Sequence, residues 1–194
     1  MKKNSSVLFA LTLCLCPFVL ESLAHPHIFV DVMAKFILTD STLSGVNVLW
    51  DFDEMTSAPL IEEFDINGNG RFEKQEYLTL EREAFSYAAN SNYFTVLTWA
   101  RNLVQINSIK QFTAIILPDK KIRYSFFISL DIKLTDIGNE KVVLFFNDPS
   151  MFVAFDLKKN MIQSSENSFW SGEIKFEKQH YYDIVVFTPK KKPK

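Results

Sequence analysis

The chain has 194 residues and a formal net charge of −2, and 47% of its residues are hydrophobic. This composition is typical of a globular domain, and the slightly acidic balance does not favour a nucleic-acid partner. Both cysteines, Cys14 and Cys16, lie in the first apolar run. The sequence after that run therefore excludes disulfides, thiolate metal sites and cysteine nucleophiles, so any metal there depends on His, carboxylate and carbonyl ligands.

The N-terminus has the three parts of a secretory signal. Lys2 and Lys3 precede an apolar run, which ends in small residues up to Ala24. We predict cleavage after Ala24, so that residues 1–24 are a signal peptide and the mature protein is periplasmic. A retained membrane anchor is the weaker alternative, because the apolar run is short for a membrane span and Glu21 follows it directly.

Most of the mature chain has the pattern of β-strands. Alternating or apolar runs rich in Ile, Val and Phe predict strands at residues 27–38, 46–52, 93–99, 103–106, 112–117, 122–130, 142–146, 152–157 and 182–187. Between residues 53 and 87 the apolar spacing is helical instead, on both sides of a loop that contains glycine. The predicted fold class is therefore α+β, a mainly antiparallel β-sheet with a helix–loop–helix insertion.

Two further details follow from local residue types. Asp53 and Thr56 are both suitable N-caps, and Pro59 is tolerated best in a first helical turn, so we expect the first helix to be short. The last residues, 189–194, are rich in lysine and proline and predict a solvated basic tail. Residues 25–188 are accordingly expected to form one domain.

The strongest motif is an EF-hand calcium loop at residues 65–76. It fits the pattern D-x-[DN]-x-[DN]-G-x₅-E at every required position, with Gly70 at the sharp turn. Such a loop supplies the six to eight hard oxygens that Ca²⁺ prefers. The predicted calcium ligands are Asp65, Asn67, Asn69, the backbone carbonyl of Arg71, Glu73 and Glu76.

An alternative to calcium binding is a loop of the same shape that is held by its own Asx-type hydrogen bonds. Glu76 at the twelfth position favours the ion, because a purely structural turn does not need it. Two asparagines in place of aspartates lower the ligand charge and predict modest affinity, roughly 10⁻⁴ to 10⁻³ M. EF-hands that act as switches normally occur in pairs, so a single motif favours a structural role.

A second candidate metal site lies at the new N-terminus. Cleavage after Ala24 makes His25 the first residue, and its α-amino and imidazole nitrogens form a chelate that suits Zn²⁺, Ni²⁺, Co²⁺ or Cu²⁺. On the strand that follows, His27 and Asp31 are expected to share one face and to add ligands. His180 can join them only through tertiary folding. The alternative is that these histidines are incidental exposed polar residues.

Several motifs together resemble a known family along nearly the whole mature chain. They are Ala-His-Pro-His-Ile-Phe-Val-Asp at 24–31, Trp-Asp-Phe-Asp-Glu at 50–54, the loop at 64–76, Tyr-Phe-Thr at 93–95, Asn-Asp-Pro at 147–149 and Phe-Val at 152–153. The sequence resembles a family of uncharacterised periplasmic proteins that genome annotation describes as the periplasmic component of an unassigned ABC-type transport system. Family members are often associated with nickel, cobalt or zinc transport, so the resemblance implies a metal-handling role beside an inner-membrane metal transporter. Asn67 and Asn69, where the family tends to aspartate, and Met151, where it tends to an aromatic residue, depart from the pattern.

These features predict a periplasmic metal-binding accessory protein of a transition-metal (Ni, Co, Zn or Cu) transport or homeostasis system, with a structural Ca²⁺ site. The first alternative is a calcium-stabilised structural or protein-interaction module of the cell envelope. An enzyme is not expected, because no Ser-His-Asp order, phosphate loop or paired-carboxylate motif stands out. A copper enzyme that uses the N-terminal histidine is the remaining alternative.

Overall fold

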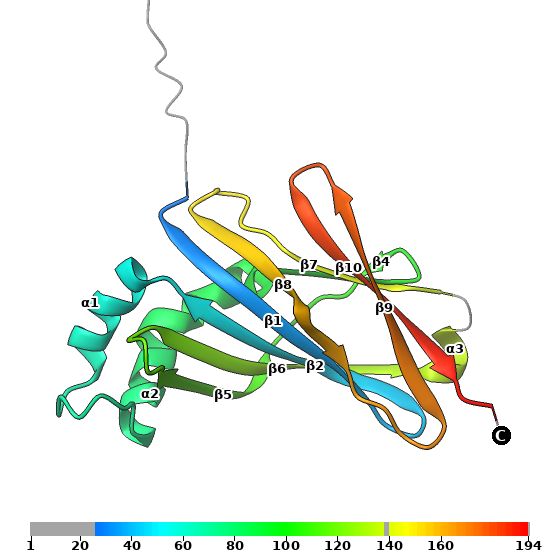
Figure 1. The fold of residues 1–194 in the computed structure, drawn as a ribbon, viewed down its shortest axis with the longest axis horizontal. Helices are drawn as coiled ribbons and strands as arrows, with labels where there is room; N and C mark the ends of the chain where they lie inside the picture. Colours follow the sequence, from blue (N-terminus) through cyan, green and yellow to red (C-terminus); the bar gives the residue numbers. More distant parts are fainter. Residues whose placement is uncertain (1–25, 138–139, 194) are drawn as a thin grey trace, which may run out of the picture.

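The computed structural model describes residues 26–137 and 140–193, which form two five-stranded sheets (Figure 1). The first sheet consists of β1 (Ile28–Leu38), β2 (Thr42–Phe52), β5 (Ile109–Ile116), β6 (Ile122–Lys133) and β8 (Val153–Ser164), in the order β5-β6-β2-β1-β8. The second consists of β3 (Thr95–Trp99), β4 (Asn102–Leu103), β7 (Val142–Phe146), β9 (Trp170–Gln179) and β10 (Tyr182–Lys191), in the order β4-β3-β7-β10-β9. The predicted β-rich α+β class is confirmed at this level.

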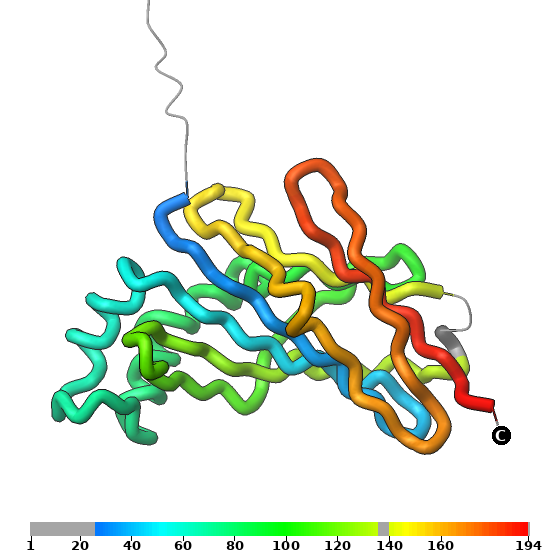
Figure 2. The backbone as a smooth tube through the Cα atoms, viewed as in Figure 1, coloured from blue at the N-terminus to red at the C-terminus, as the bar shows by residue number. Residues whose placement is uncertain are grey.

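Neighbouring strands pair in antiparallel fashion except β1 and β8, which run parallel. Figure 2 shows the start of β1 beside the segment that leads into β8. In the β1–β2 hairpin Val32 lies opposite Trp50, and both side chains are buried. This register is strongly fixed, because a slip by one residue would turn the apolar side chains of β1 to solvent.

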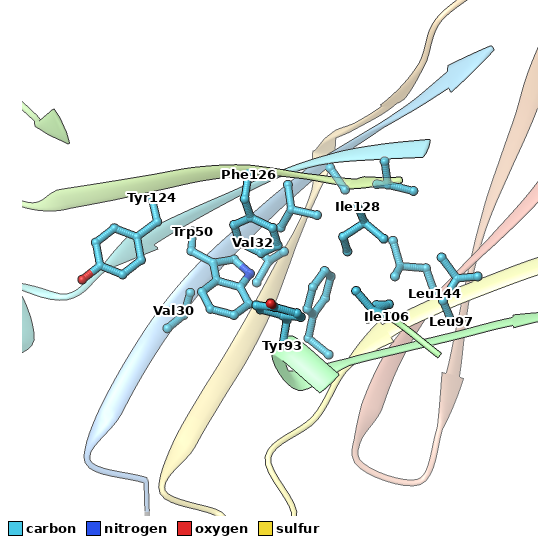
Figure 3. Packing of buried hydrophobic residues seen from close by; sticks show 14 of the residues in the cluster. Val30, Val32, Trp50, Tyr93, Leu97, Ile106, Tyr124, Phe126, Ile128 and Leu144 are labelled. Atoms are coloured by element: carbon cyan, nitrogen blue, oxygen red, sulfur yellow. The ribbon is translucent and has the colours of Figure 1, made fainter. Parts of the chain in front are cut away.

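The hydrophobic core lies between the two sheets (Figure 3). Phe36 of β1 stacks on Phe187 of β10 with ring centroids 4.4 Å apart. Trp50 of β2 meets Phe146 of β7 edge to face, at 6.2 Å between centroids. Aromatic pairs of this kind add to the hydrophobic stabilisation from buried area, and they join the sheets directly.

A helical segment connects β2 to β3 and lies at one end of the sheets, at the left in Figure 1. It consists of α1 (Glu54–Phe64), α2 (Lys74–Leu80), a π-helical turn η1 (Glu81–Phe85) and a 3₁₀ stretch η2 (Ser86–Phe94). The prediction of a short first helix is wrong, because α1 has 11 residues and Pro59 lies inside it. Asp53 caps this helix by accepting the Thr56 N–H at 2.7 Å. Pro59 removes one backbone hydrogen bond, but the capped helix continues through it.

Several other boundaries differ from the sequence prediction, and β8 extends to Ser164 instead of ending at residue 157. Strand β9 was not predicted, and it gives β10 a partner as far as Lys191. Residues 189–191 of the predicted basic tail are therefore part of the sheet, and the side chain of Lys190 pairs with Glu173 at 3.1 Å. Strand β3 begins at Thr95 rather than at Tyr93, because Tyr93 and Phe94 have positive φ angles near 50°. A short helix, α3 (Leu134–Ile137), follows β6.

None of the helices in the part of the chain that the structure describes is long and apolar enough to cross a membrane.

Candidate functional site: an oxygen-lined loop beside an apolar cavity

The loop at residues 65–76 joins α1 to α2 and is folded around the side chain of its first residue. One carboxylate oxygen of Asp65 accepts the Asn69 N–H at 3.1 Å, and the other accepts the Gly70 N–H at 2.8 Å. Gly70 has a φ of +76°, a conformation that glycine adopts without strain. The sixth position therefore makes the sharp turn that the sequence predicted.

The two asparagines of the loop are fixed in the same way. Oδ1 of Asn67 accepts the Asn69 N–H at 3.0 Å, and Oδ1 of Asn69 accepts the Arg71 N–H at 2.9 Å. An amide oxygen has two lone pairs, so each of these oxygens keeps acceptor capacity after it has been oriented by the backbone.

Glu76 closes the loop and is buried although it is charged. Its Oε1 accepts the Ile66 N–H at 3.0 Å and the Asn67 amide at 3.3 Å. Its Oε2 accepts the Glu73 N–H at 2.8 Å, as one half of a capping box at the start of α2. A single carboxylate thus ties the beginning of the loop to its end.

The loop's donor set matches the ligand preference of calcium. Hydrogen bonds connect the side chains of the predicted ligands within the loop, and Glu73 accepts a 3.1 Å bond from the Asn69 side-chain amide. Within residues 26–137 and 140–193 no group of three or more His, Cys, Asp or Glu side chains is placed to hold a metal. The carboxylates of Asp65, Glu73 and Glu76 therefore do not converge as a group of three, and a Ca²⁺ ion here would also need amide and backbone oxygens, which are hard ligands that it prefers.

The predicted histidine site lacks the hydrogen-bonded arrangement that connects the residues of the loop. His25 lies outside the described residues. His27 is exposed, and its ring lies 5.1 Å from the ring of Phe152, between centroids. Asp31 instead forms an ion pair with Lys158, at 2.9 Å from Nζ to Oδ1. His180 lies in the turn between β9 and β10.

His27 and Asp31 do not converge, for a geometric reason. A strand advances about 3.3 Å per residue, so four residues along β1 separate their Cα atoms by about 13 Å. His27 also precedes β1, where its ring lies next to that of Phe152, whereas Asp31 forms an ion pair with Lys158 of β8. The period-two alternation predicted that His27 and Asp31 lie on one face of the strand, but it does not specify whether they are close enough to bind one ion.

Sequence reasoning missed a cavity of about 550 Å³ next to His27. It lies between the inner face of the first sheet and the helical segment, and its lining is almost entirely apolar. Residues from four strands and three helical elements form its walls, among them Val30, Trp50, Phe52, Leu60, Phe85, Tyr124 and Phe155. Burial raises the pKa of Tyr124, so its hydroxyl stays protonated at neutral pH.

Two aspartates hold the edges of this cavity. Asp53 caps α1 and also accepts the Phe29 N–H of β1 at 2.7 Å. Partial desolvation raises the pKa of Asp53, but these bonds from Thr56 and Phe29 outweigh it, so that the pKa lies below its ordinary value. Asp53 is therefore explained by helix capping and strand anchoring.

Asp148 anchors the segment that leads into β8 through hydrogen bonds to its backbone. It is buried, and it accepts the backbone N–H groups of Ser150, Phe152 and Val153 at 2.9 to 3.1 Å. Desolvation raises the pKa of Asp148, but the Ser150 hydroxyl and these N–H groups lower it further, so the net shift is downward. The turn at residues 147–150 thereby positions Phe152 and Val153 at the cavity.

Comparison with known proteins identifies the family of this chain. Residues 9–192 match a family described as "Protein of unknown function (DUF1007)". The chain belongs to this DUF1007 family. It is 30% identical over 89 residues to an uncharacterised 15.5 kDa protein in the trpE 3' region of Spirochaeta aurantia, and 30% identical over 80 residues to an uncharacterised protein of Haemophilus influenzae.

These alignments cover 46% and 41% of this DUF1007 chain, and 62% and 37% of the two relatives. Neither relative's description states an activity or a ligand. The predicted membership of an uncharacterised family is thus confirmed, whereas the periplasmic location and the link to transport stay predictions for this DUF1007 member.

Proposed function

We propose that this protein is a calcium-binding accessory protein of the cell envelope, in which the loop at residues 65–76 holds a structural Ca²⁺. The observation that carries the proposal is that Asp65, Asn67, Asn69 and Glu76 each have a side-chain oxygen already held by a backbone N–H of the same loop. Such preorganisation lowers the entropy lost when an ion binds.

Calcium at this position would tie α1 to α2. The loop's own residues would provide the oxygens, while Phe72, which is buried, anchors the loop to the core. An ion that binds only the folded state stabilises it by mass action, by about 2.7 kcal/mol at a concentration of 100 times the dissociation constant. With two asparagine ligands we expect a dissociation constant of roughly 10⁻⁴ to 10⁻³ M.

Calorimetric titration of the mature chain with CaCl₂ tests this proposal. We expect one site per chain, and Glu76→Gln should weaken it by about tenfold or more because a ligand charge is lost. Glu63→Gln is the matched control, since it removes the same charge from an exposed residue of α1 just before the loop. Absence of binding at about 10 mM calcium, or equal affinities for the two variants, would overturn the proposal.

We further propose that the processed N-terminus binds a transition metal through His25 and His27, as part of nickel, cobalt, zinc or copper handling beside an inner-membrane transporter. The supporting observation is that His27 is exposed and close to the start of the described chain, so it is accessible to an ion held by a terminal His25. Asp31 is left out of this ligand set because it is paired with Lys158.

Competition with a chromophoric zinc chelator tests the second site on protein whose N-terminus has been verified by intact mass. His27→Ala should weaken metal binding, whereas His180→Ala, in the β9–β10 turn, should not. Equal behaviour of the two variants would refute this assignment without affecting the calcium loop.

A further inference from the structure

The apolar cavity beside His27 has the size of a ligand site. Its volume of about 550 Å³ is well above that of an engineered cavity of about 150 Å³ that admits benzene, and it lies within the roughly 300 to 1,000 Å³ range of small-molecule pockets. The space is partly open to solvent, so a ligand can enter it from outside.

The walls of the cavity are held open by their own packing. Trp50 contacts Phe155 with centroids 5.4 Å apart, and Phe155 contacts Phe94 at 5.7 Å. On the other side Phe52 and Tyr124 meet edge to face at 4.7 Å. Because each of these rings is supported by another ring, none of them can move into the space without breaking an aromatic pair.

The mouth of the cavity is also apolar and lies open to solvent. Tyr87 and Phe152, which line it, are 70% and 51% exposed. Exposed aromatic side chains that continue into a pocket mark binding surfaces. A small molecule fits this site better than a peptide strand, since the backbone N–H groups of Ile28 and Phe29 at the edge already donate to Phe152 O and Asp53.

The helical wall of the cavity is interrupted by the oxygen-lined loop. Leu60 of α1 comes before the loop, and Phe85 of η1 and Ala88 of η2 come after it. Any change in how the loop joins α1 to α2 therefore changes the distance between two parts of the same wall.

We propose that this cavity binds a small apolar molecule with an aromatic or hydrocarbon body, and that Ca²⁺ in the loop at residues 65–76 strengthens that binding. The effect of Ca²⁺ rests on the proposed calcium site, whereas the binding of a small molecule rests on the cavity alone. Linkage is reciprocal, so the bound molecule also raises calcium affinity by the same factor.

The fluorescent apolar probe N-phenyl-1-naphthylamine tests the proposal when it is titrated into the mature protein in calcium and in EGTA. We expect saturable binding at one site that is about fivefold or more tighter in calcium, in the ordinary range of coupling between sites. Glu76→Gln should bind the probe in calcium as weakly as the wild type does in EGTA.

Two tryptophan substitutions locate the probe. Ala84 is exposed and lines the cavity, so Ala84→Trp should block the mouth and abolish saturable binding. Ala89→Trp is the matched control, because Ala89 is exposed in the same segment but does not line this cavity. If Ala84→Trp does not fold, Leu60→Trp supplies the same test from the opposite wall.

The outcomes separate the two proposals. Calcium binding by calorimetry without saturable probe binding overturns the cavity proposal and leaves the calcium site intact. Probe binding that Ala84→Trp abolishes but calcium does not affect supports the cavity and overturns the coupling. Probe binding that weakens as protein concentration rises, with a dimer in sedimentation, means that a second copy fills the cavity and overturns the small-molecule assignment.

Discussion

The oxygen-lined loop and the apolar cavity share one helical segment but are built in opposite ways. The side-chain oxygens of the loop come from one continuous stretch, and those of Asp65, Asn67 and Asn69 are fixed by hydrogen bonds to near neighbours. The cavity takes its walls from strands and helices far apart in sequence, and aromatic packing holds them. The loop should therefore respond to an ion or to one charge, whereas the cavity should respond to changes of core volume.

The largest effect is expected from Trp50→Ala. Trp50 contacts Phe85, Phe126 and Phe155, so removal of its indole should destabilise the protein by about 3 to 5 kcal/mol in urea unfolding. The Trp50 Nε1 has no hydrogen-bond partner among the described residues. Trp50→Phe should therefore lose less than half as much, and equal losses for the two variants would show that the indole N–H matters more than the ring.

For the loop, Glu76→Gln should lower the melting temperature in calcium. At a calcium concentration of 100 times the wild-type dissociation constant, a tenfold weaker site loses about 1.3 kcal/mol of this stabilisation, and complete loss of binding loses about 2.7 kcal/mol. Differential scanning calorimetry in calcium and in EGTA measures this effect, with Glu63→Gln as the control. A deficit of the same size in EGTA would mean that Glu76 acts only through its capping bonds to Ile66 and Glu73.

Asp148→Ala is expected to cost about 1 to 3 kcal/mol, because the N–H groups of Phe152 and Val153 lose their acceptor at a buried site. Asp148→Asn keeps one carbonyl oxygen and should lose less. Chemical unfolding of both variants measures the difference. An Asn variant that is as unstable as the Ala variant would contradict the hydrogen-bond account.

Acid should weaken the edges of the cavity before it affects the hydrophobic core between the two sheets. The pKa values of Asp53 and Asp148 lie below the ordinary value of 3.8. Their contribution to stability is therefore complete above that value and is lost as pH falls through the lowered pKa values. The variant with both Asp53→Asn and Asp148→Asn should show a flatter decline in stability below about pH 4, and a decline parallel to that of the wild type would contradict this.

The smallest effect is expected from Asp31→Asn. The ion pair with Lys158 is solvent-exposed, so its loss should change stability by about 0 to 1 kcal/mol. Metal uptake at the N-terminus should not change either, since Asp31 does not reach His27. Weaker zinc binding by this variant in chelator competition would restore Asp31 to the ligand set.

The parts that sequence predicted correctly are those that depend on local pattern. The strands at Ile28–Leu38 and Val142–Phe146 are each specified by a short run of residue types. Strand β9 was missed because it lies at a sheet edge, where Trp170, Ile174 and Phe176 alternate with charged residues and few side chains are buried. Its alternation was nonetheless a usable signal.

The parts that sequence could not predict are those set by tertiary distance. Period-two alternation assigned His27 and Asp31 to one face, but it contains no information on separation along the strand or on Lys158. The cavity depends on how far the helical segment stands from the first sheet, which no single stretch of sequence specifies. Sequence predicted Asp53 as a helix cap, but its bond to the Phe29 N–H of β1 became apparent only from the structure.

Hydrogen exchange with and without calcium tests the central claim most directly, because it measures amide protection in the helical segment and in the two sheets in one experiment. If calcium in the loop fixes α1 and α2 over the cavity, amides of residues 54–94 should exchange more slowly in calcium than in EGTA, while those of β2 and β6 should be unchanged. Equal exchange of residues 54–94 in the two conditions would contradict the account.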